Sequence, residues 1–425
     1  MINEAPREPH RHFDIPAVKG GDEPHYLVML NSLMLDHDLD LKNNYASVHG
    51  GSNQAGRWFS GEPLDHHVVW FVGGQVTGWG EMYGFNPPSV VPVSKNPLVN
   101  QVRGLPEYGS HPPGLPLLLA PLLYPLRHTN FVEPAAIVFS TLAIILALLS
   151  FRRIVRIYTP DPALVNLVSA LAFLGTPAWH YGRTLYTEPY LLCFAVCSYD
   201  LWLTRRQALF AGLLIGMGSL MKPPFGLLVF PLALDVLLTR GQRMKVLALA
   251  VGPLLAGSAF LYLNFLQWGD MARSSTGLLL ASPWQGMGRL LFSMEHGWFA
   301  YAPVIAPALL GWPGLVLKKP RPSLVMLSAA ILYFAFMACW QPQLDTNGWC
   351  YGSRHLLPIT PFVVLGMVVV FQSWWYKHVY AARWLVLIVL WSSLIINVYG
   401  GVQHFKYWAA HPLSALLKRL VHLLG

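Results

Sequence analysis

The stretch EPAAIVFSTLAIILALLSF, residues 133–151, is followed directly by RRIVR and decides the fold class. A helix rises about 1.5 Å per residue and the hydrocarbon core of a bilayer is about 30 Å thick, so a spanning helix needs about 20 mostly apolar residues. The run 133–151 meets this requirement, and its basic end is typical of a cytoplasmic boundary. The chain is therefore predicted to be an integral membrane protein.

Similar apolar runs continue to residue 402. They lie near 163–182, 188–204, 207–221, 224–239, 246–266, 298–317, 323–341, 356–374 and 384–402. Together with the first run they predict an all-α, polytopic bundle of about ten transmembrane helices over residues 133–402.

The composition excludes a water-soluble chain. Of the 425 residues, 54% are hydrophobic and only 12% are charged, whereas soluble domains are about 25% charged. The net charge of +9 is explained by basic residues at span ends, which meet anionic lipid. Membrane lipids are therefore expected partners, and no nucleic acid is needed to account for the charge.

Two regions flank the predicted bundle. Residues 1–132 are predicted to form an external first-loop region, in which Tyr26–Leu35 is an amphipathic surface helix and the proline-rich run 111–127 is a half-inserted or surface helix. Residues 403–425 have apolar residues at helical spacing, which predicts an interfacial amphipathic tail.

Basic residues in the short loops set the orientation. If the first span runs inward, loops on the inner side carry thirteen Lys and Arg residues and loops on the outer side carry five. The inner set is Arg152, Arg153, Arg156, Arg205, Arg206, Arg240, Arg243, Lys245, Lys318, Lys319, Arg321, Lys377 and Arg383; the outer set is Arg183, Lys222, Arg273, Arg289 and Arg354. The positive-inside rule then places the N-terminal region and the turns near His111, Glu188, Lys222 and Arg354 on the external face.

The acidic motif GGDEPHY, residues 20–26, is the first candidate for chemistry. It places Asp22 and Glu23 after two glycines and before an apolar run. A carboxylate held at a helix start is a candidate general base, and a solvated helix start is the alternative.

Three further polar residues lie at predicted span ends. Glu188 in TLYTEPY is either a site residue or part of a helix cap. Lys222 in LMKPPF follows a span of only about 15 residues, so it faces a polar cavity or snorkels to the interface. Arg354 in GWCYGSRHLLPITPF is either a phosphate-binding guanidinium or an interfacial anchor.

Metal ligands are poorly represented. His10 with His12 and His66 with His67 are pairs without an evident third ligand, and the four cysteines form no metal-binding pattern. No metal site is therefore predicted, although a divalent metal would be compatible with the chemistry inferred below.

Four stretches, taken in order, resemble the membrane glycosyltransferases of the C-type fold, the group of protein O-mannosyltransferases and aminoarabinose transferases. They are GDEPHY, SHPPGLPLLLAP (110–121), HGWFAYAPVIAPALLGWPGL (296–315) and GWCYGSRHLLPITPF (348–362). Members of the group have a spanning helix before the acidic motif, whereas about 20 residues precede Asp22 here. We therefore expect that this chain begins late or lacks the first helix of the group.

The resemblance implies transfer of a sugar from a polyprenyl-phosphate donor on the external, periplasmic side of the inner membrane. The acceptor would be a glycan, a lipid or a protein. Asp22 is then the candidate base and Glu23 its neighbour. The candidates for binding the donor phosphate and substrate are Tyr26, His111, Glu188, Lys222 and Arg354.

Two alternatives from other classes remain. A transporter or lipid flippase would also hold Lys, Glu and Arg in a membrane cavity, but it should carry charges near midspan and repeat symmetry. A noncatalytic membrane scaffold predicts no cavity at Asp22.

Overall fold

The computed structural model describes residues 22–45, 68–72, 75–78, 104–271, 280, 282–340, 350–374 and 380–402. The chain divides into two compact units, one formed by Met1–Val138 with Gly257–Gly277 and the other by Phe139–Ala256 with Leu278–Gly425. The predicted tail 403–425 and the histidine pairs lie outside the described residues.

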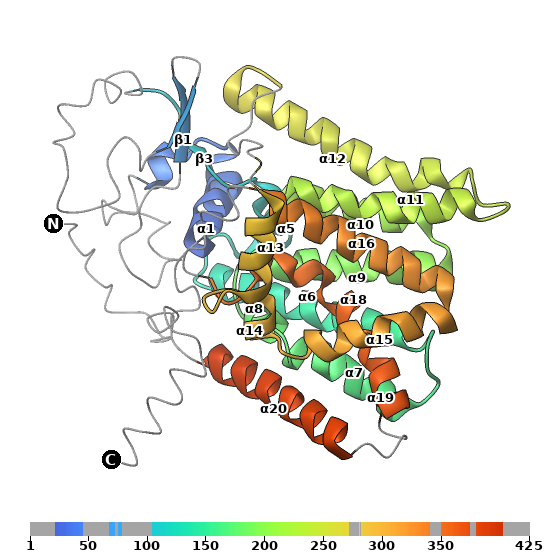
Figure 1. Ribbon diagram of the computed structural model, residues 1–425. Coiled ribbons are helices and arrows are strands. Elements are labelled where there is room, and N and C mark those ends of the chain that lie inside the picture. Colours follow the sequence, from blue (N-terminus) through green and yellow to red (C-terminus); the bar gives the residue numbers. More distant parts are fainter. Residues whose placement is uncertain are drawn as a thin grey trace, which may run out of the picture. The chain divides into compact units, whose positions relative to one another are not determined.

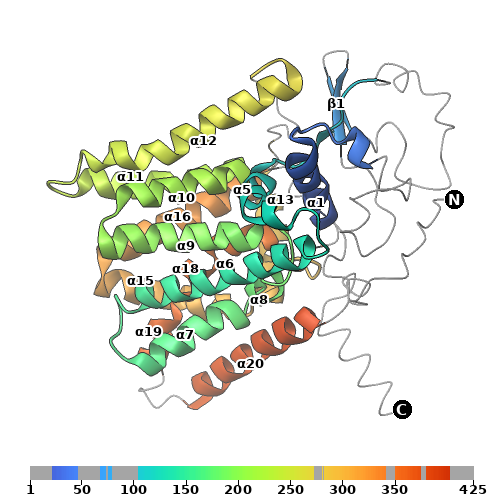
Figure 2. The same ribbon diagram turned by 180° about the vertical axis from the view of Figure 1, so that it is seen from behind.

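Most of the bundle predicted from the apolar runs belongs to the second unit, and only the start of α6 and the end of α12 belong to the first. The helices of the second unit run side by side with similar axis directions, as Figures 1 and 2 show for α7, α9, α10, α11, α15 and α16. These and the other helices of the predicted bundle are α6 (Val132–Val155), α7 (Pro162–Leu174), α8 (Ala178–Tyr181), α9 (Glu188–Arg205), α10 (Ala208–Met221), α11 (Val229–Leu238), α12 (Lys245–Trp268), α13 (Pro283–Phe292), α14 (Trp298–Tyr301), α15 (Ile305–Lys318), α16 (Pro320–Cys339), α18 (Thr360–Val364), α19 (Met367–Trp374) and α20 (Tyr380–Val402).

All ten predicted spans coincide with helix. Five helical segments are long and apolar enough to cross a membrane by themselves: Val132–Val155, Lys245–Trp268, Pro320–Cys339, Arg354–Ser373 and Arg383–Gly400. Their outward faces carry large apolar side chains, among them Leu146, Leu254 and Trp391. Such a surface suits lipid and would be unstable in water. The all-α transmembrane bundle is thus confirmed.

Several predicted spans are broken into shorter pieces, which the apolar runs did not reveal. The run 224–239 forms the 3-10 helix η5 (Pro223–Leu228) and α11, and the run 356–374 forms η6 (Arg354–Ile359), α18 and α19. Prolines account for breaks of this kind, because each lacks the N–H that a continuous helix needs. Pro223 is separated from the end of α10 by one residue, and Pro303 lies between α14 and α15.

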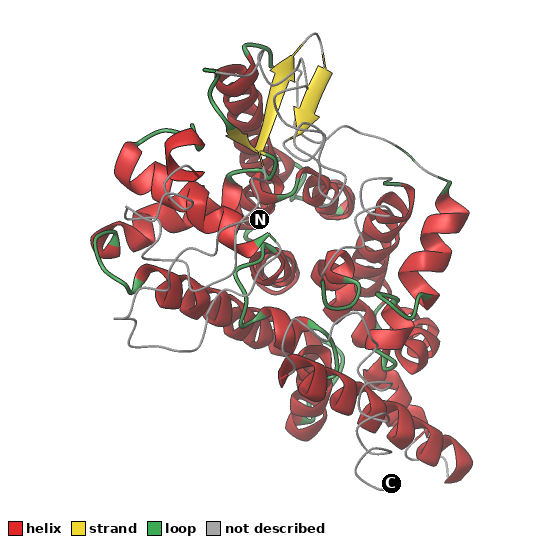
Figure 3. Cartoon of the chain, turned by 90° about the vertical axis from the view of Figure 1, so that its left-hand side faces the viewer, coloured by secondary structure: helices red, strands yellow, loops and turns green. Residues whose placement is uncertain are grey.

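The first unit is smaller and mixed. Its elements are α1 (Glu23–Asn31), a π-helical turn η1 (Ser32–Asp36), β1 (Val68–Val72), β2 (Gln75–Gly78), β3 (Tyr108–Gly109), α5 (Gly114–Leu123) and η4 (Tyr124–Leu126). The strands form an antiparallel sheet of order β2-β1-β3, with Trp70 opposite Thr77 and Val69 opposite Tyr108. Figure 3 shows that strands are confined to this one sheet among the described residues.

The prediction of an amphipathic surface helix at Tyr26–Leu35 is wrong. A helix does form there, but every residue of α1 is buried, and the helix packs against α5. Its polar positions are satisfied internally: His25 Nδ1 lies 2.8 Å from the hydroxyl of Tyr45. A helix covered on all sides cannot lie on the membrane with one face in water.

Two glycines allow α10 and α12 to approach closely. A Cβ atom at Gly252 would overlap the backbone carbonyl of Gly212, and one at Gly212 would overlap the carbonyl of Leu249. Small residues at such crossings are typical of membrane helices, which associate through close backbone packing.

Gly252→Ala should therefore lower the midpoint of thermal unfolding in detergent, because overpacking typically costs about 1–3 kcal/mol. The matched control is Gly257→Ala on the same helix, where an added Cβ meets nothing within 4 Å. There alanine should be neutral or stabilising, since it favours helix over glycine by about 1 kcal/mol. Equal midpoints for both variants would contradict the close crossing.

Candidate functional site

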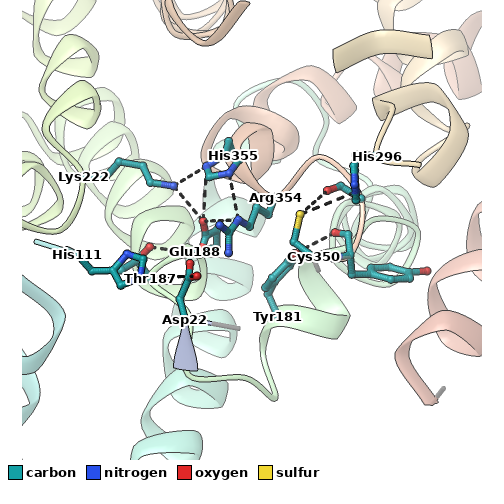
Figure 4. Close-up of polar contacts among 12 residues, drawn as sticks. Asp22, His111, Tyr181, Thr187, Glu188, Lys222, His296, Cys350, Arg354 and His355 are labelled. Carbon is teal, nitrogen blue, oxygen red and sulfur yellow. Dashed lines mark hydrogen bonds and ion pairs between the residues drawn. The ribbon is translucent and has the colours of Figure 1, made fainter. Parts of the chain in front are cut away.

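A buried carboxylate at one end of the bundle gathers two cations. Glu188 Oε1 lies 3.0 Å from Lys222 Nζ and 3.9 Å from Arg354 Nε. The Glu188 side chain is 2% exposed, and those of Lys222 and Arg354 are 13% and 12% exposed. Figure 4 shows Lys222 and Arg354 approaching Glu188 and His355 from opposite sides. We call Glu188, Lys222, Arg354 and His355 the cation cluster.

Local sequence explains where each member of the cation cluster sits. Glu188 begins α9, where the positive end of the helix dipole stabilises a carboxylate, and it accepts a hydrogen bond from Thr187 Oγ1 at 3.2 Å. Lys222 ends α10 in an extended conformation before Pro223 and Pro224. A residue before proline avoids the helical region, so the KPP sequence stops α10 and leaves a cation at its negative end.

Arg354 is oriented by the turn that precedes η6. Gly352 has φ of +63°, and a side chain there would press against Tyr301 and Pro177 at 3.0–3.1 Å. Glycine is therefore required at this turn. The guanidinium carbon of Arg354 lies 5.0 Å from the centre of the Tyr186 ring, a cation–π contact that limits its movement.

The cation cluster carries net positive charge. One carboxylate faces one ammonium and one guanidinium, and all three are largely withdrawn from water. Removing charges from water strengthens their interactions, because screening falls with the local dielectric constant. Counting only the four described residues of the cluster, an anion with a single negative charge would balance the excess cation.

A second set of ion pairs lies at the opposite end of α9. Arg153 binds the fully buried Asp200 at 2.6 Å, and Arg321 binds Asp235 through Nε and a second guanidinium nitrogen at 2.7 and 2.9 Å. Burial, followed by repulsion from Arg321, lowers the pKa of Arg206 beside Asp235. Both carboxylates are held by arginine, and Asp235 also accepts a hydrogen bond from Trp202 Nε1 at 2.6 Å. These ion pairs therefore stabilise helix ends.

The acidic motif lies in the first unit. Asp22 precedes α1, and its Oδ1 lies 3.8 Å from Nε2 of His111. Both side chains are partly exposed, at 20% and 23%. The ring of Tyr26 lies 5.6 Å from the His111 ring and is itself buried. Tyr26 therefore positions His111 and is covered from solvent.

Exposure separates the two adjacent carboxylates. Glu23 is 1% exposed, whereas the Asp22 side chain is 20% exposed. A general base must approach the proton that it removes to within about 3.2 Å. Of the two, Asp22 is the more accessible carboxylate.

The structure thus collects the sequence-predicted residues into two groups. Glu188, Lys222 and Arg354 meet in the second unit, and Asp22, Tyr26 and His111 meet in the first. From their shared predicted side of the membrane we predict that Asp22, His111, Lys222 and Arg354 surround one pocket. Sequence analysis missed His355, although its place next to Arg354 in a largely apolar segment was a usable signal. Among the described residues, no group of three or more His, Cys, Asp or Glu residues is arranged to hold a metal ion.

Comparison with known families decides the class of protein. The model of glycosyltransferase family 87 matches residues 110–350, more than half of the 425-residue chain. The chain belongs to glycosyltransferase family 87. The matched range of this family 87 chain includes His111, Glu188 and Lys222. No curated relative matches it.

Among solved structures, the family 87 chain is similar to the crystal structure of ArnT from Cupriavidus metallidurans in the apo state. The two share 12% sequence identity with a TM-score of 0.48, over 94% of this chain and 71% of that chain.

Family membership confirms the resemblance on which the sequence analysis relied. The chain is a multi-pass membrane glycosyltransferase, as the order of its motifs predicted. This favours an enzyme over the transporter and scaffold alternatives.

Proposed function

We propose that the chain transfers a sugar from a polyprenyl-phosphate donor to an acceptor hydroxyl of a glycan, a lipid or a protein. The observation that carries this proposal is the cation cluster, in which two largely buried cations, Lys222 and Arg354, face one carboxylate. Phosphate is an anion that both a guanidinium and an ammonium bind well.

Charge and surroundings favour a lipid-linked donor. A polyprenyl-phosphate sugar is a phosphodiester with one negative charge, which matches the excess of one cation, whereas a nucleotide diphosphate sugar carries two. The cluster also lies at the ends of apolar helices whose outer faces suit lipid chains.

The chemistry follows from the groups present. The bond from the anomeric carbon to the phosphate oxygen breaks, and its electron pair leaves on the phosphate, which Lys222 and Arg354 stabilise. The acceptor oxygen forms the new bond to the anomeric carbon, and its proton passes to Asp22. Glu188 does not bind phosphate, because like charges repel; it holds the two cations in place.

The proposal is tested with purified protein in liposomes, given a labelled polyprenyl-phosphate sugar or the same sugar on a nucleotide, together with a membrane extract as acceptor source. We expect labelled acceptor and free polyprenyl phosphate from the lipid-linked donor alone. Transfer from the nucleotide sugar would overturn the lipid donor. Movement of lipid across the bilayer without transfer would instead support a flippase.

We further propose that the cation cluster faces the periplasm and that the protein resides in the inner membrane. The positive-inside distribution supports this orientation, since Arg205, Arg240 and Lys318 lie at the other ends of their helices. In intact cells stripped of the outer membrane, Arg183→Cys should react with an impermeant thiol reagent and Arg240→Cys should not. Labelling of both variants from one side would contradict the topology.

A further inference from the structure

His355 places one ring nitrogen against each cation of the cluster. Its Nδ1 lies 2.6 Å from Lys222 Nζ and its Nε2 lies 3.0 Å from Arg354 Nε. Figure 4 shows the imidazole between the two side chains. The ring is 11% exposed, so water contributes little to its hydrogen bonds.

The proton count does not allow both contacts to be satisfied. A lysine ammonium and an arginine guanidinium are donors only, and a neutral imidazole has one N–H and one acceptor nitrogen. Whichever tautomer forms, one cation meets an N–H group. A protonated ring would be worse, because it accepts from neither cation.

The two cations differ in what else they can bind inside the cluster. Lys222 also donates to Glu188 Oε1 at 3.0 Å, whereas Arg354 Nε is 3.9 Å from the same oxygen, beyond a hydrogen bond. Lys222 is therefore the cation that Glu188 holds more closely. A phosphate suits the other cation, because its oxygens match the bidentate geometry of a guanidinium.

We propose that His355 is a positioning residue. Its Nδ1 keeps the contact with Lys222, whereas the contact between its Nε2 and Arg354 is broken when Arg354 binds the donor phosphate. This inference rests on the proposed function, because it assigns the anion to the lipid-linked donor. The imidazole sets the spacing of the two cations before the donor arrives. Donor binding removes the conflict between the Nε2 proton and Arg354.

Three substitutions separate the two contacts. His355→Asn retains an acceptor near the Nδ1 position and therefore the contact with Lys222. His355→Gln retains an acceptor near the Nε2 position and therefore the contact with Arg354. His355→Phe retains an aromatic ring and removes both contacts. We expect near-normal donor affinity for Asn, weaker binding for Gln and the weakest for Phe. Removal of a hydrogen bond to a charged group typically weakens binding about 10- to 100-fold. His355→Phe should therefore raise the donor Kd and KM by this factor, with a smaller change in kcat.

Binding of a labelled polyprenyl-phosphate sugar is measured beside kcat, KM and thermal unfolding, with His128→Phe at an exposed site as the matched control. If Arg354→Ala weakens donor binding but the three His355 variants bind the donor with affinities equal to one another, the inference is overturned and the proposed function stands. If wild type does not bind the lipid-linked donor, or Arg354→Ala binds it unchanged, the proposed function fails instead. If His355→Phe does not fold, the order of donor affinities of His355→Asn and His355→Gln decides.

Discussion

Asp22→Asn should lower the rate of sugar transfer by about 10² to 10⁴, the usual contribution of a general base, while donor binding stays intact. Asparagine has the size of aspartate but cannot take up the acceptor's proton. Asp22 is the N-cap residue that precedes α1, and asparagine serves equally well at that position, so the fold should be unaffected. The measurement is transfer from a labelled lipid-linked sugar, with donor binding determined in parallel.

Asp161→Asn is the matched control for this substitution. Asp161 is likewise the N-cap residue of a helix with proline in its first turn, and its carboxylate accepts a hydrogen bond from the Ala163 N–H at 2.9 Å. Asparagine can make the same bond, so activity and stability should match wild type. Full activity of Asp22→Asn would show that Asp22 is only a helix start and that another group is the base.

Arg354→Ala should lower kcat/KM by about 10² to 10³, because it removes charge-assisted hydrogen bonds worth about 1.5–3 kcal/mol each. An arginine that binds the phosphate acts in the ground state and in the transition state, so KM should rise and kcat should fall. Lys222→Ala should have the same pattern with a smaller effect, since an ammonium lacks the planar fork. Steady-state kinetics with varied donor concentration provide the test.

Arg183→Ala is the control for Arg354→Ala. Arg183 is exposed, lies on the same predicted side of the membrane and contacts the Trp179 ring at 5.7 Å from its centre. Its removal should leave the donor KM unchanged, because it lies outside the cation cluster. An equal rise in KM for both variants would indicate a general electrostatic effect of the external face. In that case Arg354 would have no specific role.

The pair of variants also distinguishes the roles of the two groups. If Asp22 is a base, Asp22→Asn should lose transfer and retain donor binding. If Arg354 is a phosphate-binding cation, Arg354→Ala should weaken donor binding. A scaffold protein would show neither effect. A flippase would lose donor binding in the second variant, but it would have no transfer to lose in the first.

Sequence periodicity could locate the helices but not their breaks or their burial. The run 356–374 was apolar throughout, so it was predicted as one span, whereas the chain forms η6, α18 and α19 in sequence. Tyr26–Leu35 was predicted as a surface helix because polar residues follow it, yet α1 is buried on all sides. Burial depends on which neighbours cover a helix, and contacts such as those between α1 and α5 join residues about 90 positions apart.

The sequence by itself determined the membrane class, the helix positions and the candidate charges, because hydrophobicity and the cost of charge in lipid act locally along the chain. Only the tertiary structure decided that Glu188 holds Lys222 and Arg354, that Glu23 is buried while Asp22 is partly exposed, and that His355 joins the cluster. Lys222 and His355 are 133 positions apart. Such contacts arise when packed helices bring their ends together, and no local pattern encodes which ends meet.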